Sequence, residues 1–175
     1  MSKKVEIKVE SIFNTVFQQE LINSSDRACV ILGGAGLDVA LYNLLKKFFI
    51  NDKIVEELIG VNNGNAPLGT FSSKVKVAYC LGLISEDNYR DLQYVRKIRN
   101  IFAHKLQGFS FETNQIKSWV GNLIFIKQLN AKNSGKHIFP IKTQFIISIY
   151  QLGGQIESNT KSVKHINKLG NSILS

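Results

Sequence analysis

The densest group of polar side chains that could do chemistry lies in the stretch Arg-Lys-Ile-Arg-Asn-Ile-Phe-Ala-His, which ends at His104. On a helix, Arg96, Asn100 and His104 are four residues apart and share one face, with Arg99 beside them. Arginine presents a fixed fork of donors to phosphate, and histidine exchanges a proton near neutral pH. Together these groups could hold and cleave a phosphodiester, with a ribose 2′-OH as nucleophile and no metal.

A structural interpretation of the same residues is favoured by the residue types alone. In it, Asn100 and His104 are buried hydrogen-bonding struts between helices, and Arg99 pairs with a carboxylate. Fully satisfied buried networks of this kind rigidify a core. The acids that could pair with the arginine are Asp26, Asp38 and Asp87.

A second charged pair, Arg27 and Asp38, flanks a strongly apolar segment. The two residues are eleven positions apart and fall on nearly the same helix face. The pair is either part of a site or a buried salt bridge, and the spacing favours the salt bridge, whose net stabilising value is uncertain in general.

A loop motif, Asn-Ala-Pro-Leu-Gly-Thr-Phe-Ser, begins at Asn65. Pro67 rigidifies the loop and Gly69 allows a turn. Thr70 or Ser72 then caps the next helix. The motif is therefore predicted to be structural.

Apolar residues recur at helical spacing through most of the chain, which predicts an all-α protein. A central buried helix is expected from about residue 26 to 50, and its glycines, Gly33, Gly34 and Gly36, are expected to allow close approach of a neighbouring helix. Gly153-Gly154 is expected to end or kink the helix that starts at Pro140. The N-caps expected along the chain are Ser24-Ser25-Asp26, Asp52, Thr70 or Ser72, and Ser85. The whole predicts a single-domain bundle of about six or seven helices over residues 1–175.

Composition fits a soluble globular chain: 44% of residues are hydrophobic and 20% are charged. The net charge of +9 is uneven, because residues 105–175 hold nine Lys and only two acids. Such an excess favours an acidic partner, including nucleic acid, although a solvated lysine-rich face explains it equally well.

Metal, cofactor and membrane sites are not expected. Three His and two Cys show no metal-ligand spacing. Cys29 and Cys80 lie in apolar runs and are predicted to be buried free thiols in a reducing compartment. The longest apolar run is too short to span a bilayer, and no secretory signal is visible, so a cytoplasmic location is expected.

Four ordered blocks resemble the mannitol operon repressor family. They are Ser25-Asp26-Arg27 with Leu37-Asp38, residues 65–74, residues 78–84, and residues 98–104. The resemblance covers about residues 22–107, whereas the basic helices of residues 108–175 diverge. It implies an all-helical bacterial regulator that represses or modulates transcription of a sugar-uptake operon. It also implies no helix-turn-helix, so repression would work through a protein partner.

A wider resemblance points to a different function. Arg99, four intervening residues and His104 look like the R-x4-6-H motif of the HEPN superfamily, many of whose members are metal-independent ribonucleases. Carried over, Arg99 and His104 would be catalytic and Asn100 would support them. Active members usually work as dimers, so this alternative would make the chain a homodimer.

Overall fold

The computed structural model describes residues 11–60, 66–105, 107–132 and 139–167. Within these residues the chain is all-α. Residues 114–132 form two short helices, which brings the number of helices in the described part to eight, one more than expected. The helices are α1 (Thr15–Asn23), α2 (Asp26–Phe48), α3 (Lys53–Ile59), α4 (Phe71–Cys80), α5 (Glu86–His104), α6 (Asn114–Gly121), α7 (Ile124–Lys132) and α8 (Ile141–Ser162).

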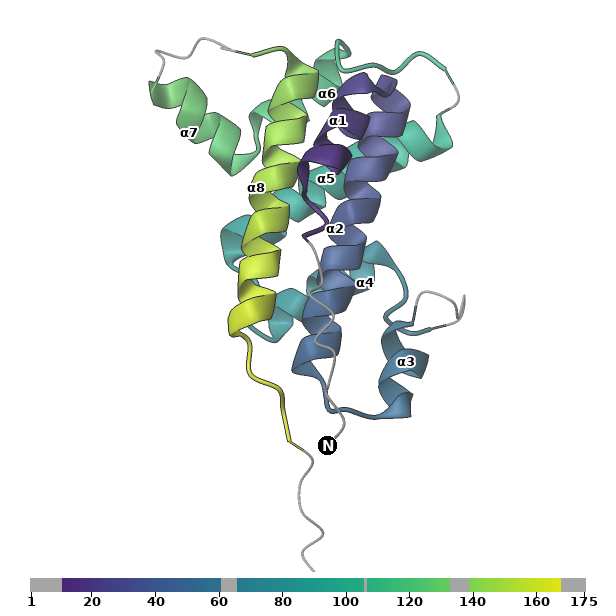
Figure 1. Cartoon of the computed structure of the whole chain (residues 1–175). Coiled ribbons are helices and arrows are strands. Elements are labelled where there is room, and N and C mark those ends of the chain that lie inside the picture. The colour runs from purple at the N-terminus through teal and green to yellow at the C-terminus, as the bar shows by residue number, and fades with distance from the viewer. Residues whose placement is uncertain (1–10, 61–65, 106, 133–138, 168–175) are drawn as a thin grey trace, which may run out of the picture.

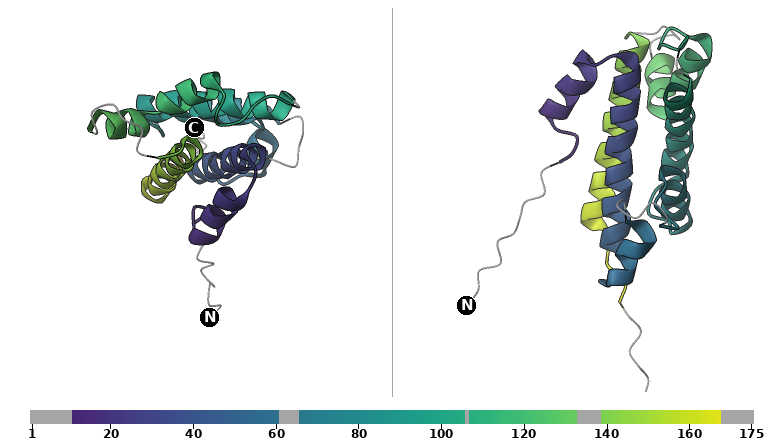
Figure 2. Two further views of the ribbon diagram at one scale, coloured as in Figure 1. Left: turned by 90° about the horizontal axis from the view of Figure 1, so that it is seen from above. Right: turned by 90° about the vertical axis from the view of Figure 1, so that its right-hand side faces the viewer.

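The helices form three layers. Figure 1 shows the two longest, α2 and α8, running side by side along the molecule. Seen from above in Figure 2, α5, α6 and α7 cover one face of this pair, and α1 lies on the opposite face. Helix α2 contacts α1, α3, α4, α5 and α8. It is therefore the central helix that its apolar composition predicts.

The starts of α2, α3, α4 and α5 were predictable because each of these helices carries its own polar cap. Ser25 accepts a hydrogen bond from the backbone N–H of Ala28, at 3.2 Å, and starts α2. The side chains of Asp52, Thr70 and Ser85 do the same for α3, α4 and α5. A side-chain oxygen at this position satisfies a backbone donor that the helix leaves free. These three caps and Ser25 are confirmed.

The glycines of α2 allow close packing, as expected. A β-carbon on Gly33 would lie 3.2 Å from Ile149 of α8, and one on Gly36 would lie 3.0 Å from the ring of Phe17. The close approach of α8 and α1 to α2 depends on the missing side chains. The hydrophobic core then runs as one cluster from Leu21 to Ile156.

Two expectations are wrong. Helix α8 does not end at Gly153-Gly154 but continues to Ser162. The glycine at position 153 leaves room for the ring of Phe13, which a β-carbon there would overlap. Cys80, expected to be buried, is exposed at the end of α4. Cys29 is buried as expected, and burial raises the pKa of its thiol to about 11.

Helix α2 is long and apolar enough to cross a membrane by length and composition alone. In the folded chain, 56% of its most apolar stretch is buried inside the protein. A central core helix has this property, since its apolar surface faces other helices.

Candidate functional site

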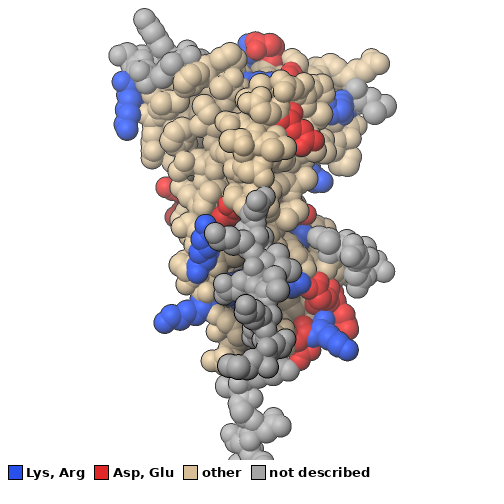
Figure 3. All heavy atoms as spheres, viewed as in Figure 1, with Lys and Arg blue, Asp and Glu red and all other residues tan. Residues whose placement is uncertain are grey.

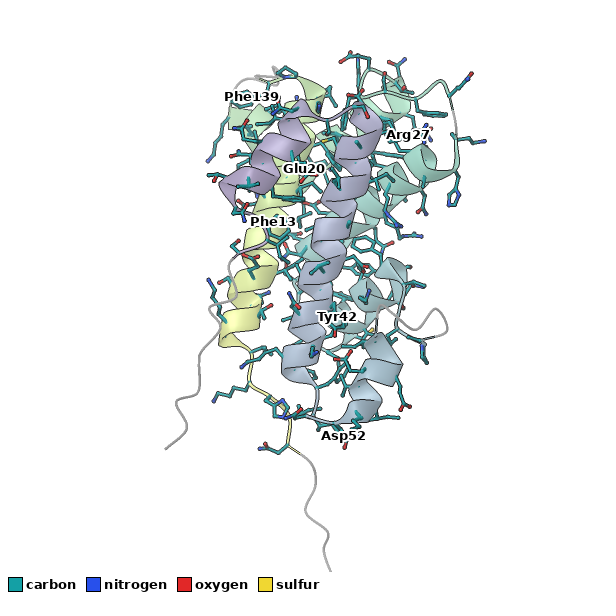
Figure 4. All side chains as sticks on the ribbon, turned by 45° about the vertical axis from the view of Figure 1, so that its right-hand side comes forward. Phe13, Glu20, Arg27, Tyr42, Asp52 and Phe139 are labelled. Carbon is teal, nitrogen blue, oxygen red and sulfur yellow. The ribbon has the colours of Figure 1, made fainter. Side chains whose placement is uncertain are left out.

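The N-terminus of α2 holds the C-terminal end of α5 in place. The Arg27 guanidinium donates to the backbone carbonyl of Phe102, and to that of Lys105 at 2.6 Å. The neighbouring Asp26 carboxylate accepts the backbone N–H of Phe111, at 2.9 Å. A cation is favourable at a helix C-terminus, where backbone carbonyls lack partners. Arg27 lies at the upper end of α2 in Figure 4.

Arg99 lies in the seam between α5 and α2. A β-carbon on Gly34 would lie 3.0 Å from Cδ of Arg99, so the aliphatic part of the arginine occupies the space that the glycine leaves. One turn earlier, Nε of Arg96 donates to the side chain of Gln93, at 3.0 Å. Packing of this kind fixes the stem of an arginine while the charged group reaches the surface.

The polar end groups on this part of α5 remain available. His104 is exposed, and Arg96, Arg99 and Asn100 are partly exposed. The side chains of Arg99, Asn100 and His104 make no hydrogen bond or ion pair with another described residue. We refer to Arg96, Arg99, Asn100 and His104 together as the basic stripe.

The interpretation of the stripe as a buried network is therefore wrong. His104 is exposed rather than a strut, and the acids expected near Arg99 have other roles. Asp26 accepts the N–H of Phe111, and Asp38 forms an ion pair with Lys74. Asp87 lies exposed in the first turn of α5, at the other end of that helix.

The predicted Arg27–Asp38 salt bridge is also wrong. Both residues face the same side of α2, but eleven residues of helix separate them by about 16 Å along the axis. Asp38 instead accepts from Nζ of Lys74, at 2.8 Å. Lys74 is fully buried and also donates to the carbonyl of Gly69, at 3.1 Å.

The loop motif has the structural role that its residues predict. Thr70, rather than Ser72, caps α4 by accepting from the N–H of Ser73, at 3.1 Å. The turn before it closes with a hydrogen bond from Gly69 N–H to Ala66 carbonyl oxygen, and Pro67 is exposed within that turn. Asn65 lies outside the described residues.

Lys74 is the residue that the sequence interpretation missed. It anchors the loop motif to α2 through Asp38, so the first two blocks of the family resemblance meet in one buried ion pair. Residue type gave no signal, because lysine is almost always exposed. The only hint was its position at the end of the loop block.

Helix α5 is electrically polarised. Its first turns carry three acids, Glu86, Asp87 and Asp91, and one arginine, Arg90. The basic residues Arg96, Lys97, Arg99 and His104 follow toward the end. This order complements the helix dipole. The helix therefore presents an acidic half and a basic half to different parts of the surface.

The described lysines of the C-terminal third lie on different elements. Lys142 donates to the carbonyls at the end of α1, whereas Lys132 and Lys161 lie at the ends of α7 and α8. On the face shown in Figure 3, basic side chains are scattered and mixed with acidic ones. In the part of the chain that the structure describes, no group of His, Cys, Asp and Glu is arranged to hold a metal ion.

The fold and these blocks match a known family. The model of the mannitol repressor family, MtlR, matches residues 9–153. The chain belongs to the mannitol repressor family. The family resemblance drawn from the ordered blocks is thereby confirmed. The match also extends beyond residue 107, into the part of the chain that we expected to diverge.

Two solved structures have the same fold. One, the X-ray structure of the MtlR-HPr complex from Escherichia coli, matches with a TM-score of 0.65 and 21% identity, covering 84% of this chain and 99% of that one. The other, a possible transcriptional regulator YggD from Shigella flexneri 2a, matches with a TM-score of 0.65 and 13% identity, covering 81% and 95%. No curated protein matches the chain in sequence.

Proposed function

We propose that this protein is a transcriptional regulator of the mannitol repressor type that acts in the cytoplasm through a protein partner. The observation that carries the proposal is the family match over residues 9–153. A regulator of transcription requires no catalytic group, so the basic stripe would serve binding. The burial of α2 in the protein core supports a soluble location.

The partner to test first is HPr. The similar protein from Escherichia coli was solved as an MtlR-HPr complex. We propose that the basic stripe of α5 contributes to the docking surface, because two arginines stand there beside the exposed His104. Arginine is enriched at protein interfaces and forms bidentate pairs with carboxylates. The stripe therefore fits an acidic patch on the partner.

Calorimetric titration of HPr into the purified chain tests both parts of the proposal. Binding by the wild-type protein is expected. The variant Arg96→Gln/Arg99→Gln keeps part of each aliphatic stem, removes two charges, and is expected to weaken binding by roughly tenfold or more. A transcriptional reporter under a mannitol-operon promoter should lose repression in the same variant.

The matched control is Lys161→Gln/Lys164→Gln, which removes the same charge at the exposed end of α8 and the segment after it. This control should bind like the wild type. If both double variants weaken HPr binding equally, binding depends only on net charge. The basic stripe would then not be part of the docking surface. If the protein represses the reporter but does not bind HPr, its partner is a protein other than HPr.

A metal-independent ribonuclease is the second candidate function. It is favoured by the exposure of His104 and by the absence of a bonded partner for Arg99 and Asn100 among the described residues. Total RNA and tRNA incubated with the protein in EDTA test it directly. The regulator proposal predicts intact RNA with both wild type and His104→Ala. Cleavage by the wild type alone, with the variant folded by circular dichroism, would make the protein an enzyme.

A further inference from the structure

A cleft lies at the opposite end of α5 from the basic stripe. Its volume is about 370 Å³, and it lies between the first turns of α5, the start of α7 and one face of α8. In Figure 1, α7 lies beside α8, and α5 passes behind α8 and α2. The volume is at the small end of the range for ligand pockets, about 300–1,000 Å³, and suits a small molecule.

The lining of this cleft is polar on all three helices. Helix α8 contributes Ser148, Gln151, Gln155 and Ser158, which follow one another at steps of three and four residues. Most bundle helices present apolar residues at such spacing to a neighbour. Here the stripe is polar, and Gln128 of α7 faces the same space.

Several of these groups are free to bind. Gln128, Gln151 and Gln155 are exposed, and their side chains have no hydrogen bond or ion pair with another described residue. A side-chain amide offers two donors and one acceptor, which matches a hydroxyl group that both donates and accepts. Other polar atoms of the lining are already used: Asn159 donates to the Leu83 carbonyl, at 2.9 Å.

The charge of the lining selects among ligands. Asp87 and Asp91 are its only charged residues, and neither lysine nor arginine lines it. Carboxylates in a lining that holds no lysine or arginine disfavour an anion, and the exposed Asp87 can accept a hydrogen bond from a hydroxyl donor. Asp91 is buried and already accepts the backbone N–H of Ile124. The ring of Phe125 and the side chain of Leu152 add apolar surface for C–H groups. A neutral molecule rich in hydroxyl groups meets all of these conditions.

We propose that the cleft between α5, α7 and α8 binds a small neutral polyol or monosaccharide. Binding in this cleft would leave the basic stripe open, because the two lie at opposite halves of α5. A role for the ligand as an effector of repression rests on the proposed function, whereas binding itself does not.

The experiment is a titration of ¹⁵N-labelled protein with D-mannitol and D-sorbitol, followed by NMR. At least one of them should produce saturable shifts confined to the cleft, including the side-chain amides of Gln128, Gln151 and Gln155. Thermal shift is a poor substitute, because polyols stabilise most proteins by exclusion from their surface. Shifts that are spread over the whole chain and linear in concentration would overturn the proposal.

Variants locate the site. Gln151→Ala/Gln155→Ala should weaken binding by roughly tenfold, since it removes two hydrogen-bonding groups. Gln18→Ala/Gln19→Ala removes two exposed glutamines from α1 and should leave binding unchanged. If both double variants weaken polyol binding equally, the binding site does not lie in the cleft.

A phosphorylated ligand separates neutral from anionic recognition. D-Mannitol 1-phosphate should bind more weakly than D-mannitol because of the two carboxylates. Tighter binding of the phosphate would overturn the assignment to a neutral ligand. If the wild-type protein binds HPr but no polyol, the ligand proposal for the cleft fails while the proposed function stands. The two proposals can therefore fail separately.

Discussion

At the scale of single residues, the buried ion pair between Lys74 and Asp38 joins α4 to α2. The lysine is fully buried, so its charge depends on the carboxylate 2.8 Å away. We expect Asp38→Ala to lower the free energy of unfolding by about 3 kcal/mol, because an unpaired charge stays in the core. Adding Lys74→Met removes that charge and should recover most of the loss. Urea denaturation of both single variants and the double variant measures the coupling between the two residues. If the two changes in unfolding free energy simply add, the residues are not coupled.

Asp91 makes the stability of the protein depend on pH. Burial raises the pKa of its carboxyl to about 6, and the hydrogen bond from the backbone N–H of Ile124 opposes that shift only in part. Asp87 also raises this pKa, whereas Arg90 and Lys127 lower it. Because the folded protein holds the proton more tightly than the unfolded chain, this group favours folding most below about pH 4. That contribution is lost as the pH rises through about 6.

We therefore expect the unfolding free energy of Asp91→Asn to rise relative to that of the wild type as the pH increases from about 4 to about 7. Urea denaturation at several pH values measures the difference in unfolding free energy. The control is Asp87→Asn, which changes an exposed carboxylate on the same helix. Its difference in unfolding free energy from the wild type should depend less on pH. Parallel pH profiles for the wild type and Asp91→Asn would show that the buried carboxyl titrates normally.

At the scale of elements, two adjacent glycines in α8 have opposite surroundings. A β-carbon on Gly154 would meet nothing within 4 Å, so Gly154→Ala should stabilise the protein by about 0.5–1 kcal/mol through helix propensity. A β-carbon on Gly153 would overlap the ring of Phe13. Gly153→Ala should therefore destabilise by about 1–3 kcal/mol as Phe13 is displaced. Thermal unfolding compares the two, and a change of the same sign in both would contradict the packing at Phe13.

The elements were predictable wherever the signal is local. Ser25, Asp52 and Ser85 cap helices that begin at the next residue, so a short window contains both cause and effect. The glycine pair of α8 was misread because a glycine that breaks a helix and one that allows close contact look the same in sequence. The contact with Phe13 comes from the other end of the chain, 140 residues away.

At the scale of the whole molecule, the part of the site that depends on local spacing was predictable, whereas the part that depends on contacts between distant residues was not. The shared face of Arg96, Asn100 and His104 follows from helical spacing, and the structure places it on one helix. The partner of Arg27 lies 75 residues away, and that of Lys74 lies 36 residues away. Tertiary packing alone brings such groups together. It also decides that His104 is exposed.

The same packing predicts that the C-terminal helices unfold as one cooperative unit with the rest of the chain. Helix α8 packs along the length of α2, and Leu37 of α2 is fully buried in the shared core. We expect Leu37→Ala to lower the free energy of unfolding by about 2–5 kcal/mol. Fluorescence of Trp119 reports on α6, and far-UV circular dichroism reports on all helices. Both should follow a single urea transition and shift equally in the variant. A separate Trp119 transition, unmoved by Leu37→Ala, would divide the chain into an N-terminal core and an independent C-terminal unit.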